Sequence, residues 1–204
     1  AADAMEEVEI EIPALEGRDI LVRIKATATN PVDFKILTGW GNPEAKVENS
    51  PEIVGFDGAG IVEAVGPDAT KFKKGDRVYY SGVLNKRGTF SELAVVDERL
   101  VGTPPKKLSW AEASSVPLTA LTAYEGIVEQ LQLTPPTTDE ERKANSEKVF
   151  LVTPGAGGVG SFVIQMAKHV FGFTVVATAS RPETTKYCKE KGADHVISHY
   201  EKLK

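Results

Sequence analysis

The sequence predicts an α/β protein whose first part is rich in β-strands, and two patterns carry this prediction. Across about the first 110 residues, short segments that alternate apolar and polar side chains end at glycine or proline, which is typical of a small barrel or sandwich. After residue 148, short apolar runs alternate with helical patterns, which is typical of a parallel βαβαβ unit. We therefore divide the chain into a β-rich domain at 1–113 and a second, partial domain at 114–204.

The individual elements follow from the same patterns. Alternation and turn residues predict a short helix at 32–37 and strands at 8–12, 19–26, 58–65, 77–80 and 89–96. Ser109 and Glu112 have the spacing of a capping box at a helix start. The polar stretch 134–148 is expected to be an exposed loop. Around it we expect helices at 118–131, 159–171 and 182–191, and strands at 149–152, 174–177 and 195–197.

Composition narrows the class of protein. The 204 residues carry 24 Lys and Arg against 29 Asp and Glu, a net charge of −5, which argues against a nucleic-acid partner or an anionic membrane surface. No apolar run approaches the roughly 20 residues that span a bilayer. Cys188 is the single cysteine, so an internal disulfide is impossible and a reducing compartment, the cytoplasm, is expected.

The strongest motif is a glycine-rich turn between an apolar run and a helical pattern. It fits G-x-G-x-x-G, with the six residues Gly155, Ala156, Gly157, Gly158, Val159 and Gly160. In this context the pattern predicts a dinucleotide site: Gly155 permits a tight turn, Gly157 lets a pyrophosphate approach the backbone, and Gly160 lets the helix pack against the strand. The N–H groups at the helix start then face the phosphates. The alternative is a glycine-rich turn without a ligand.

The end of the second apolar run indicates which dinucleotide is bound. NAD-binding proteins usually carry an acid about 20 residues after the glycines, where it holds the ribose hydroxyls. This chain has Ser180 and Arg181 there, and Glu183 comes only after a proline. A 2′-phosphate repels an acid and is bound well by hydroxyl and guanidinium groups, so NADPH is favoured over NADH. The alternative is that Arg181 is only a solvated charge at a helix start.

Five motifs occur along the chain in order. They are Asn30 to Asp33, Pro51 to Gly60, Lys74 to Val78, Pro117 to Tyr124, and Gly155 to Gly160. In this order they resemble the medium-chain dehydrogenases/reductases, and within them the quinone-oxidoreductase-like branch that is often labelled a zinc-type alcohol dehydrogenase family. The resemblance implies a GroES-like barrel at 1–113, a partial Rossmann domain at 114–204 and a homodimer for the full-length protein. Relatives have six parallel strands where this chain offers three, so the chain is expected to be truncated at its C-terminus.

The ligands of the zinc-dependent relatives are missing at the matching positions. Those relatives carry a cysteine near Asn30 and a His-Glu pair where this chain has Phe56 and Asp57. Neither the remaining ligands nor the four-cysteine lobe can be built from one Cys and three His. We therefore expect no zinc, and we interpret Asp57 as a packed or hydrogen-bonded residue.

Without zinc, the resemblance implies hydride transfer from NADPH to a small activated acceptor, a quinone or an α,β-unsaturated carbonyl. It implies that Asn30 faces the nicotinamide, that Thr122 lies near the nicotinamide or the ribose-phosphate, and that His199 lies near the adenosine ribose, where relatives often have Tyr. Asn30 as a plain helix cap and Thr122 as a plain helix residue remain the alternatives.

No catalytic acid is assigned from the sequence. Enoyl-reductase relatives have a tyrosine after the position of Gly39, whereas this chain has Trp40, which cannot act as an acid. Tyr79 and Tyr80 are the other hydroxyls considered, and both are equally well explained as strand-packing residues. A non-catalytic nucleotide-binding or scaffold protein is the second hypothesis for the chain.

Overall fold

The computed structural model describes residues 5–37, 53–84 and 86–200. The chain divides into two compact units, Ala1–Leu118 and Thr119–Lys204. The domain boundary placed after residue 113 from the sequence stays a prediction. Gly39 and Trp40 lie outside the described residues. Among the described residues, every helix is too short or too polar to cross a membrane.

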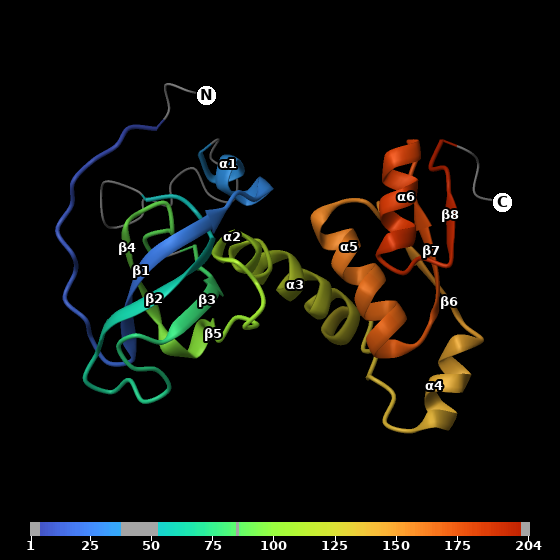
Figure 1. Ribbon diagram of the computed structural model, residues 1–204, viewed down its shortest axis with the longest axis horizontal. Coiled ribbons are helices and arrows are strands. Elements are labelled where there is room, and N and C mark those ends of the chain that lie inside the picture. The colour runs from blue at the N-terminus through green and yellow to red at the C-terminus, as the bar shows by residue number, and fades with distance from the viewer. Residues whose placement is uncertain (1–4, 38–52, 85, 201–204) are drawn as a thin grey trace. The chain divides into compact units, whose positions relative to one another are not determined.

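The first unit is built on an antiparallel five-stranded sheet in the order β4-β1-β2-β3-β5 (Figure 1). One face of the sheet carries the apolar core because strand side chains alternate between the two faces. Ile20 and Val22 of β1 pack in this core with Val62 of β2, Val78 of β3 and Val96 of β4. The strands are β1 (Asp19–Ala28), β2 (Asp57–Val65), β3 (Arg77–Ser81), β4 (Leu93–Asp97) and β5 (Val101–Gly102).

Short helices follow the strands of the first unit. The predicted capping box is confirmed at α2, where Ser109 Oγ accepts the N–H of Glu112 at 3.2 Å and the Glu112 carboxylate accepts the N–H of Ser109 at 2.9 Å. The predicted helix at 32–37 is confirmed as α1. The elements are α1 (Pro31–Leu37), the 3-10 turn η2 (Glu98–Leu100) and α2 (Trp110–Ser114). Helix α3 (Pro117–Tyr124) crosses the boundary after Leu118 and continues in the second unit as the π-helical turn η3 (Glu125–Gln130).

The second unit has a parallel three-stranded sheet in the order β6-β7-β8. Its core joins Val175 and Ala177 of β7 to Ile164 and Phe171 from one helix and Cys188 from the next. The predicted βαβαβ unit is therefore confirmed. The elements are α4 (Asp139–Ser146), β6 (Val149–Val152), α5 (Gly158–Gln165) with its continuation η4 (Met166–Phe171), β7 (Thr174–Thr178), α6 (Pro182–Glu190) and β8 (His195–Ile197).

Three predicted elements differ from the structure. Residues 8–12 form no strand, because their alternation finds no partner strand among the described residues and leaves Ile12 53% exposed. The strand predicted from 89 begins at Leu93; Thr89 and Phe90 instead donate their N–H groups to the carbonyls of Gly55 and Val54.

The loop predicted at 134–148 contains helix α4. Its start has a side-chain cap, since Thr138 Oγ1 accepts the N–H of Glu141 at 3.2 Å. Asp139, Glu140 and Glu141 in its first turn also favour a helix N-terminus electrostatically. The prediction of a loop rested on the two prolines and the high charge, and it did not take these capping residues into account.

A buried carboxylate holds the turn between β4 and β5. Glu98 is 1% exposed, and it accepts the N–H groups of Thr70 at 3.0 Å and Lys71 at 2.6 Å together with a guanidinium N–H of Arg18 at 2.9 Å. These donors lower the pKa of Glu98 below its ordinary value of 4.5, the backbone N–H of Thr70 contributing most.

The substitution Glu98→Gln should lower the melting temperature at pH 7, because an amide can accept fewer of these bonds and loses the ion pair. The lowered pKa makes this stabilisation complete above pH 4.5 and lost as the pH falls through the folded-state value. The gap between wild type and variant should therefore shrink in thermal melts below that pH. Glu92→Gln, at an exposed position, is the matched control; an equal shift in both variants would contradict the assignment.

Candidate dinucleotide site

The glycine-rich loop joins the carboxyl end of β6 to the start of α5. The N–H of Gly155 donates to the carbonyl of Thr178 at 3.0 Å, which ties the loop to the last residue of β7. The N–H of Ala179 donates in turn to the carbonyl of Ile197, the last residue of β8. Because the strands are parallel, the segments after all three meet at one edge of the sheet, the place where open α/β sheets bind ligands.

The outer glycines of the motif are required by close packing. A Cβ on Gly160 would lie 2.1 Å from the carbonyl oxygen of Pro154 and 2.9 Å from that of Gly155, so the helix approaches the loop as the sequence predicts. A Cβ on Gly155 would lie 2.7 Å from Ala177 Cβ and 3.0 Å from Cys188 Sγ. Its φ lies outside the left-handed region, so packing on β7 and α6, rather than turn geometry, requires this glycine.

The middle of the motif has a different character. A Cβ on Gly157 would meet no atom within 4 Å, so the fold itself does not require glycine there. Gly157 is exposed and occupies the N-cap position of α5, with no side-chain cap for the helix. The uncapped N–H groups and the uncovered backbone suit a phosphate group. The structure therefore fits a dinucleotide pyrophosphate at this loop.

Four further predicted residues lie in this loop, in its helix or beside it. Ala156 packs on the core of the unit and Val159 is half-buried in the first turn of α5. A Cβ on Gly158 would lie 3.0 Å from Thr119 Cγ2, so α3 runs beside the loop. Thr122, three residues after Thr119, is exposed on the same side of α3.

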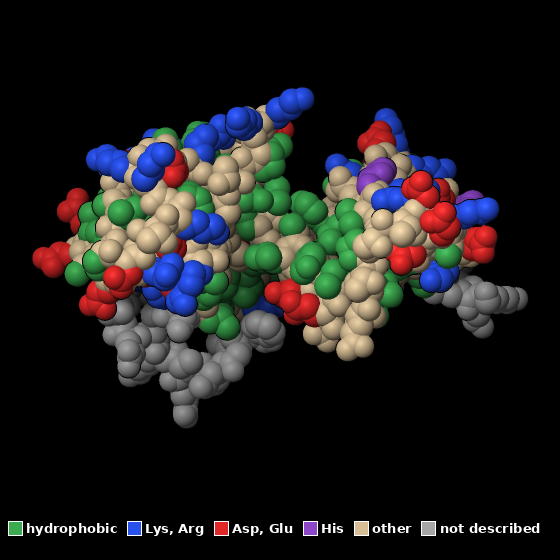
Figure 2. All heavy atoms as spheres, turned by 90° about the horizontal axis from the view of Figure 1, so that it is seen from below, with side chains coloured by type: hydrophobic (Ala, Val, Ile, Leu, Met, Phe, Trp, Pro, Cys, Tyr) green, Lys and Arg blue, Asp and Glu red, His purple; other side chains and the backbone are tan. Residues whose placement is uncertain are grey.

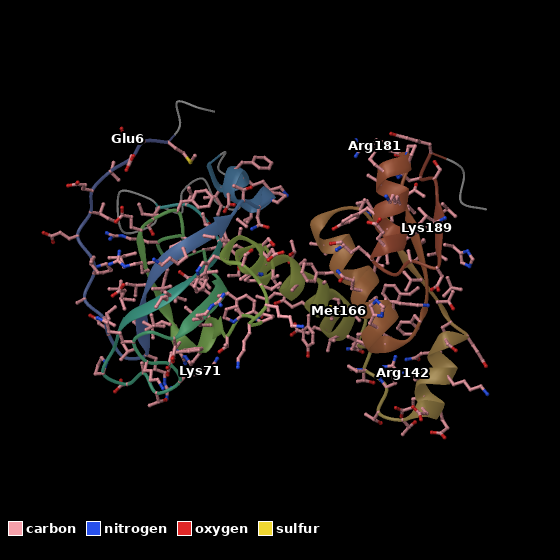
Figure 3. The ribbon with its side chains drawn as sticks, viewed as in Figure 1. Glu6, Lys71, Arg142, Met166, Arg181 and Lys189 are labelled. Atoms are coloured by element: carbon pink, nitrogen blue, oxygen red, sulfur yellow. The ribbon has the colours of Figure 1, made fainter. Side chains whose placement is uncertain are left out.

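The residues expected to choose the cofactor follow β7. Ser180 is half-buried, and Arg181 lies at the start of α6 with its side chain 70% exposed (Figure 3). Arg181 Nε is 3.2 Å from the carboxylate of Glu183, which is equally exposed, so this ion pair is weak. His199 is exposed two residues after β8, with its ring centroid 4.6 Å from that of Tyr200. On the face seen in Figure 2, acidic and basic side chains are interspersed over this unit.

The topology thus brings eight of the predicted residues to one edge of the second sheet, beside α3 with Thr122. The eight are Gly155, Ala156, Gly157, Gly158, Val159, Gly160, Ser180 and Arg181. His199 follows the third strand of the same sheet, and Asn30 belongs to the first unit.

Asn30 is held by two buried carboxylates. Its Nδ2 donates to Asp57 Oδ2 at 2.8 Å, and its backbone N–H donates to Asp33 Oδ2 at 2.6 Å. Its carbonyl accepts the N–H of Asp33 at 3.0 Å, so the residue has the backbone position of a helix cap while its side-chain amide is bonded elsewhere. Sequence reasoning missed Asp33 in this role, although the spacing of Asn30 and Asp33 is that of a capping box.

Burial raises the pKa of both carboxyls. For Asp57, which is 1% exposed, the pKa rises to about 6; hydrogen bonds from Asn30 and Leu118 oppose the desolvation, and the nearby charge of Asp33 adds to it. The pKa of Asp33 is raised mainly by burial. Asp57 Oδ1 accepts the N–H of Leu118 at 2.8 Å, so each oxygen of Asp57 has a protein donor.

The tyrosines considered as acids lie in packed positions. Tyr80 is 3% exposed within the core of the first unit, and its burial raises its pKa well above the usual range. The ring of Tyr79 covers Gly102 of β5, where a Cβ would lie 2.8 Å from Tyr79 Cε1. Among the described residues, no three His, Cys, Asp or Glu side chains are grouped so that they could hold a metal ion.

Comparison with protein families identifies both units. Residues 16–106 match the alcohol dehydrogenase GroES-like domain, and residues 158–204 match the zinc-binding dehydrogenase family. The first unit is therefore a GroES-like domain, and the second is the start of a nucleotide-binding domain.

Curated relatives agree with both matches. A zinc-type alcohol dehydrogenase-like protein of Staphylococcus aureus is 41% identical over 191 residues, which are 94% of this chain and 53% of the relative. A 2-methylene-furan-3-one reductase of Solanum lycopersicum is 38% identical, over 95% of this chain and 48% of the relative. A chloroplastic NADPH-dependent alkenal/one oxidoreductase of Arabidopsis thaliana is 34% identical, with the same coverage. The chain spans about half the length of these relatives.

Solved structures share the fold. The quinone oxidoreductase of Pseudomonas syringae is 30% identical, with a TM-score of 0.75 over 97% of this chain and 55% of the other. The Escherichia coli quinone oxidoreductase, solved in complex with NADPH, is 27% identical, with a TM-score of 0.76 over 96% of this chain and 54% of the other.

The contrast between Gly160 and Gly157 is directly testable by denaturant unfolding. Gly160→Ala places a methyl group against backbone carbonyls and should cost about 3 kcal/mol, near the upper end for overpacking. Gly157→Ala enters open space and should cost about 1 kcal/mol or less, the usual penalty for alanine at an N-cap. Equal losses in the two variants would show that the motif is not divided into packing and open positions.

Proposed function

Because the chain belongs to the medium-chain dehydrogenase/reductase family, we propose that the natural protein carrying it is an NADPH-dependent, zinc-independent oxidoreductase that reduces a quinone or an α,β-unsaturated carbonyl. The observation that carries the proposal is the glycine loop, in which packing demands Gly155 and Gly160 while Gly157 leaves an uncovered helix N-terminus. The tomato and Arabidopsis reductases and the Pseudomonas syringae quinone oxidoreductase, to which the chain is similar, support this class of acceptor.

The proposed contacts of the cofactor follow the sheet edge. The N–H groups at the start of α5 bind the pyrophosphate between residues 155 and 160. Ser180 and Arg181 bind the 2′-phosphate; Arg181 is available because its pair with Glu183 is exposed and weak. His199 lies toward the adenosine ribose, and Asn30 and Thr122 lie toward the nicotinamide.

Zinc independence rests on what Asp57 does in this chain. The two oxygens of its carboxylate accept N–H groups of Asn30 and Leu118, which leaves this carboxylate committed to the protein rather than to a metal. Phe56 beside it offers no ligand atom. The acceptor must therefore be one that needs no Lewis acid for reduction.

Bound NADPH supplies the hydride, and this chain's residues bind and orient it. A quinone or enone accepts a hydride when the donor is held at close range, so positioning provides most of what the protein contributes. Tyr80 is too deeply buried to donate a proton, and we propose that the proton comes from solvent. The proposal includes a homodimer, which the family resemblance implies. It also includes the cytoplasm as compartment, because Cys188 is the single cysteine and its thiol is free and buried.

The natural protein that contains these 204 residues should oxidise NADPH when a naphthoquinone or a small enone is added, followed by the loss of NADPH absorbance. Treatment with a strong chelator should leave the rate unchanged. Gly157→Ala, which retains the fold, should weaken NADPH binding at least about tenfold, because its methyl group occupies the approach of the phosphate. Measurable NADPH binding with no turnover on any acceptor would favour the non-catalytic nucleotide-binding protein instead.

Replacement of Arg181 tests the choice between NADPH and NADH. Arg181→Ala should raise the dissociation constant of NADPH about tenfold or more, since hydrogen bonds to a charged group contribute roughly 1.5–3 kcal/mol. NADH has no 2′-phosphate, so its affinity should change less than about twofold. Glu183→Gln, which removes the partner of Arg181, is the control and should not weaken NADPH binding. Equal losses for both dinucleotides would refute the assignment of Arg181.

A further inference from the structure

We propose that Asp57 is a positioning residue. With Asp33 it forms a carboxylate clamp that sets the orientation of the Asn30 side-chain amide. In this orientation Nδ2 of Asn30 faces Asp57, and Oδ1 lies on the other branch of the amide. The clamp is defined as Asp33, Asp57 and the asparagine that they hold. This inference rests on the proposed function for its consequence in catalysis, because only that proposal places Asn30 beside the nicotinamide.

The contacts of Asp57 determine which end of the Asn30 side-chain amide faces it. An ionised carboxylate only accepts hydrogen bonds. With a pKa of about 6, Asp57 is mainly ionised at neutral pH. The group of Asn30 that faces Asp57 Oδ2 at 2.8 Å must then be its NH2 group, although an amide nitrogen and oxygen have almost the same shape. Asn30 consequently offers an acceptor, Oδ1, on its other branch, which suits an N–H or O–H donor such as a carboxamide or a ribose hydroxyl.

Hydrogen bonds to both the side chain and the backbone of Asp57 fix its position. Its Oδ1 accepts the N–H of Leu118, a backbone donor that cannot turn over. Its carbonyl accepts the hydroxyls of Thr27 at 2.6 Å and Thr89 at 2.8 Å, and its backbone pairs with Ala28 and Ser81 on the two neighbouring strands. The carboxylate therefore has one way to meet Asn30.

Asp33 completes the clamp from the other side. It lies in the first turn of α1, and its Oδ2 accepts the backbone N–H of Asn30 at 2.6 Å. Asn30 is thus held at its backbone by one carboxylate and at its side chain by another. Burial disfavours the ionised forms of both carboxylates and raises the pKa of each, and the nearby charge of Asp33 adds to the effect at Asp57. A fold that keeps such a pair for packing alone would gain more from apolar residues.

Asp57→Asn tests the clamp because it retains the shape and exchanges one acceptor for a donor. The remaining oxygen must accept from the fixed N–H of Leu118, so the new NH2 group faces the NH2 group of Asn30, whose amide must turn over. In the natural protein at about pH 8, where Asp57 is ionised, we expect kcat to fall about tenfold and the dissociation constant of NADPH to change less than about threefold.

A double-mutant cycle with Asn30→Ala separates positioning from folding. If Asp57 acts through Asn30, adding Asp57→Asn to Asn30→Ala should change kcat by less than about twofold. Glu98→Gln provides the matched control: it removes an equally buried carboxylate from the same unit, and it should lower the melting temperature while leaving kcat unchanged. Additive losses in the cycle, or a fall in kcat with Glu98→Gln equal to that with Asp57→Asn, would overturn the proposal.

Asp33→Asn gives an internal contrast. Its remaining oxygen can still accept the single N–H of Asn30, so kcat should fall less than with Asp57→Asn. A larger loss with Asp33→Asn would contradict the ranking of the two carboxylates.

A readout that needs no turnover keeps the clamp separate from the proposed function. The side-chain NH2 protons of Asn30, assigned by their loss in Asn30→Ala, should exchange slowly with solvent in wild-type protein and quickly in Asp57→Asn. Fast exchange in the wild type would overturn the clamp even if Asp57→Asn fails to fold. If the wild type turns over no quinone or enone while these protons are protected, the proposed function fails and the clamp stands.

Discussion

The approach of two backbones at Gly160 is the constraint on which the second unit depends. Carbonyl oxygens of Pro154 and Gly155 lie close to where any other residue at position 160 would place its Cβ, so this third residue of α5 must be glycine. That contact directs the axis of α5, with its N–H groups, to the carboxyl edge of β6 and β7. The open helix N-terminus at the loop thus follows from how closely a helix can approach a parallel strand. Packing requires Gly155 and Gly160, whereas Gly157 meets no packing constraint.

The first unit depends instead on buried carboxylates that collect donors. Glu98 gathers two backbone N–H groups and a guanidinium, and its pKa falls. Asp57 gathers one backbone N–H and one amide, which do not offset its desolvation, and its pKa rises. The same physical effects therefore separate a carboxylate whose burial is compensated from one whose burial is not. A carboxylate that is fully compensated is explained by the fold, whereas one that keeps a net cost of burial invites a functional explanation.

Sequence reasoning predicted most of the fold because its strongest signals are local. The strands at 19–26 and 174–177 and the capping box at Ser109 each depend on neighbours in the chain, and the structure contains all three. Residues 8–12 show the limit: alternation favours a strand, but a partner strand must also be present. Helix α4 shows the opposite case. A loop was predicted there, yet the highly charged segment forms a helix whose start is capped by Thr138. The glycine motif lies between β6 and α5 as predicted, Gly155 is required by packing rather than by a tight turn, and the role of Gly157 at a pyrophosphate stays a prediction.

The clamp could not be read from the sequence, because it joins positions 30, 33 and 57 through tertiary contacts. Comparison with zinc-dependent relatives suggested that Asp57 is a packed or hydrogen-bonded residue, but not which residues it contacts. In the structure the carboxylate accepts hydrogen bonds with both oxygens, and this makes it a determinant of its neighbour's orientation. An amide beside a neutral partner could turn over at little cost, whereas an amide beside an acceptor that cannot donate has one orientation. A carboxylate whose two oxygens accept protein hydrogen bonds can therefore orient a neighbouring amide, through the one hydrogen-bonding polarity that it allows.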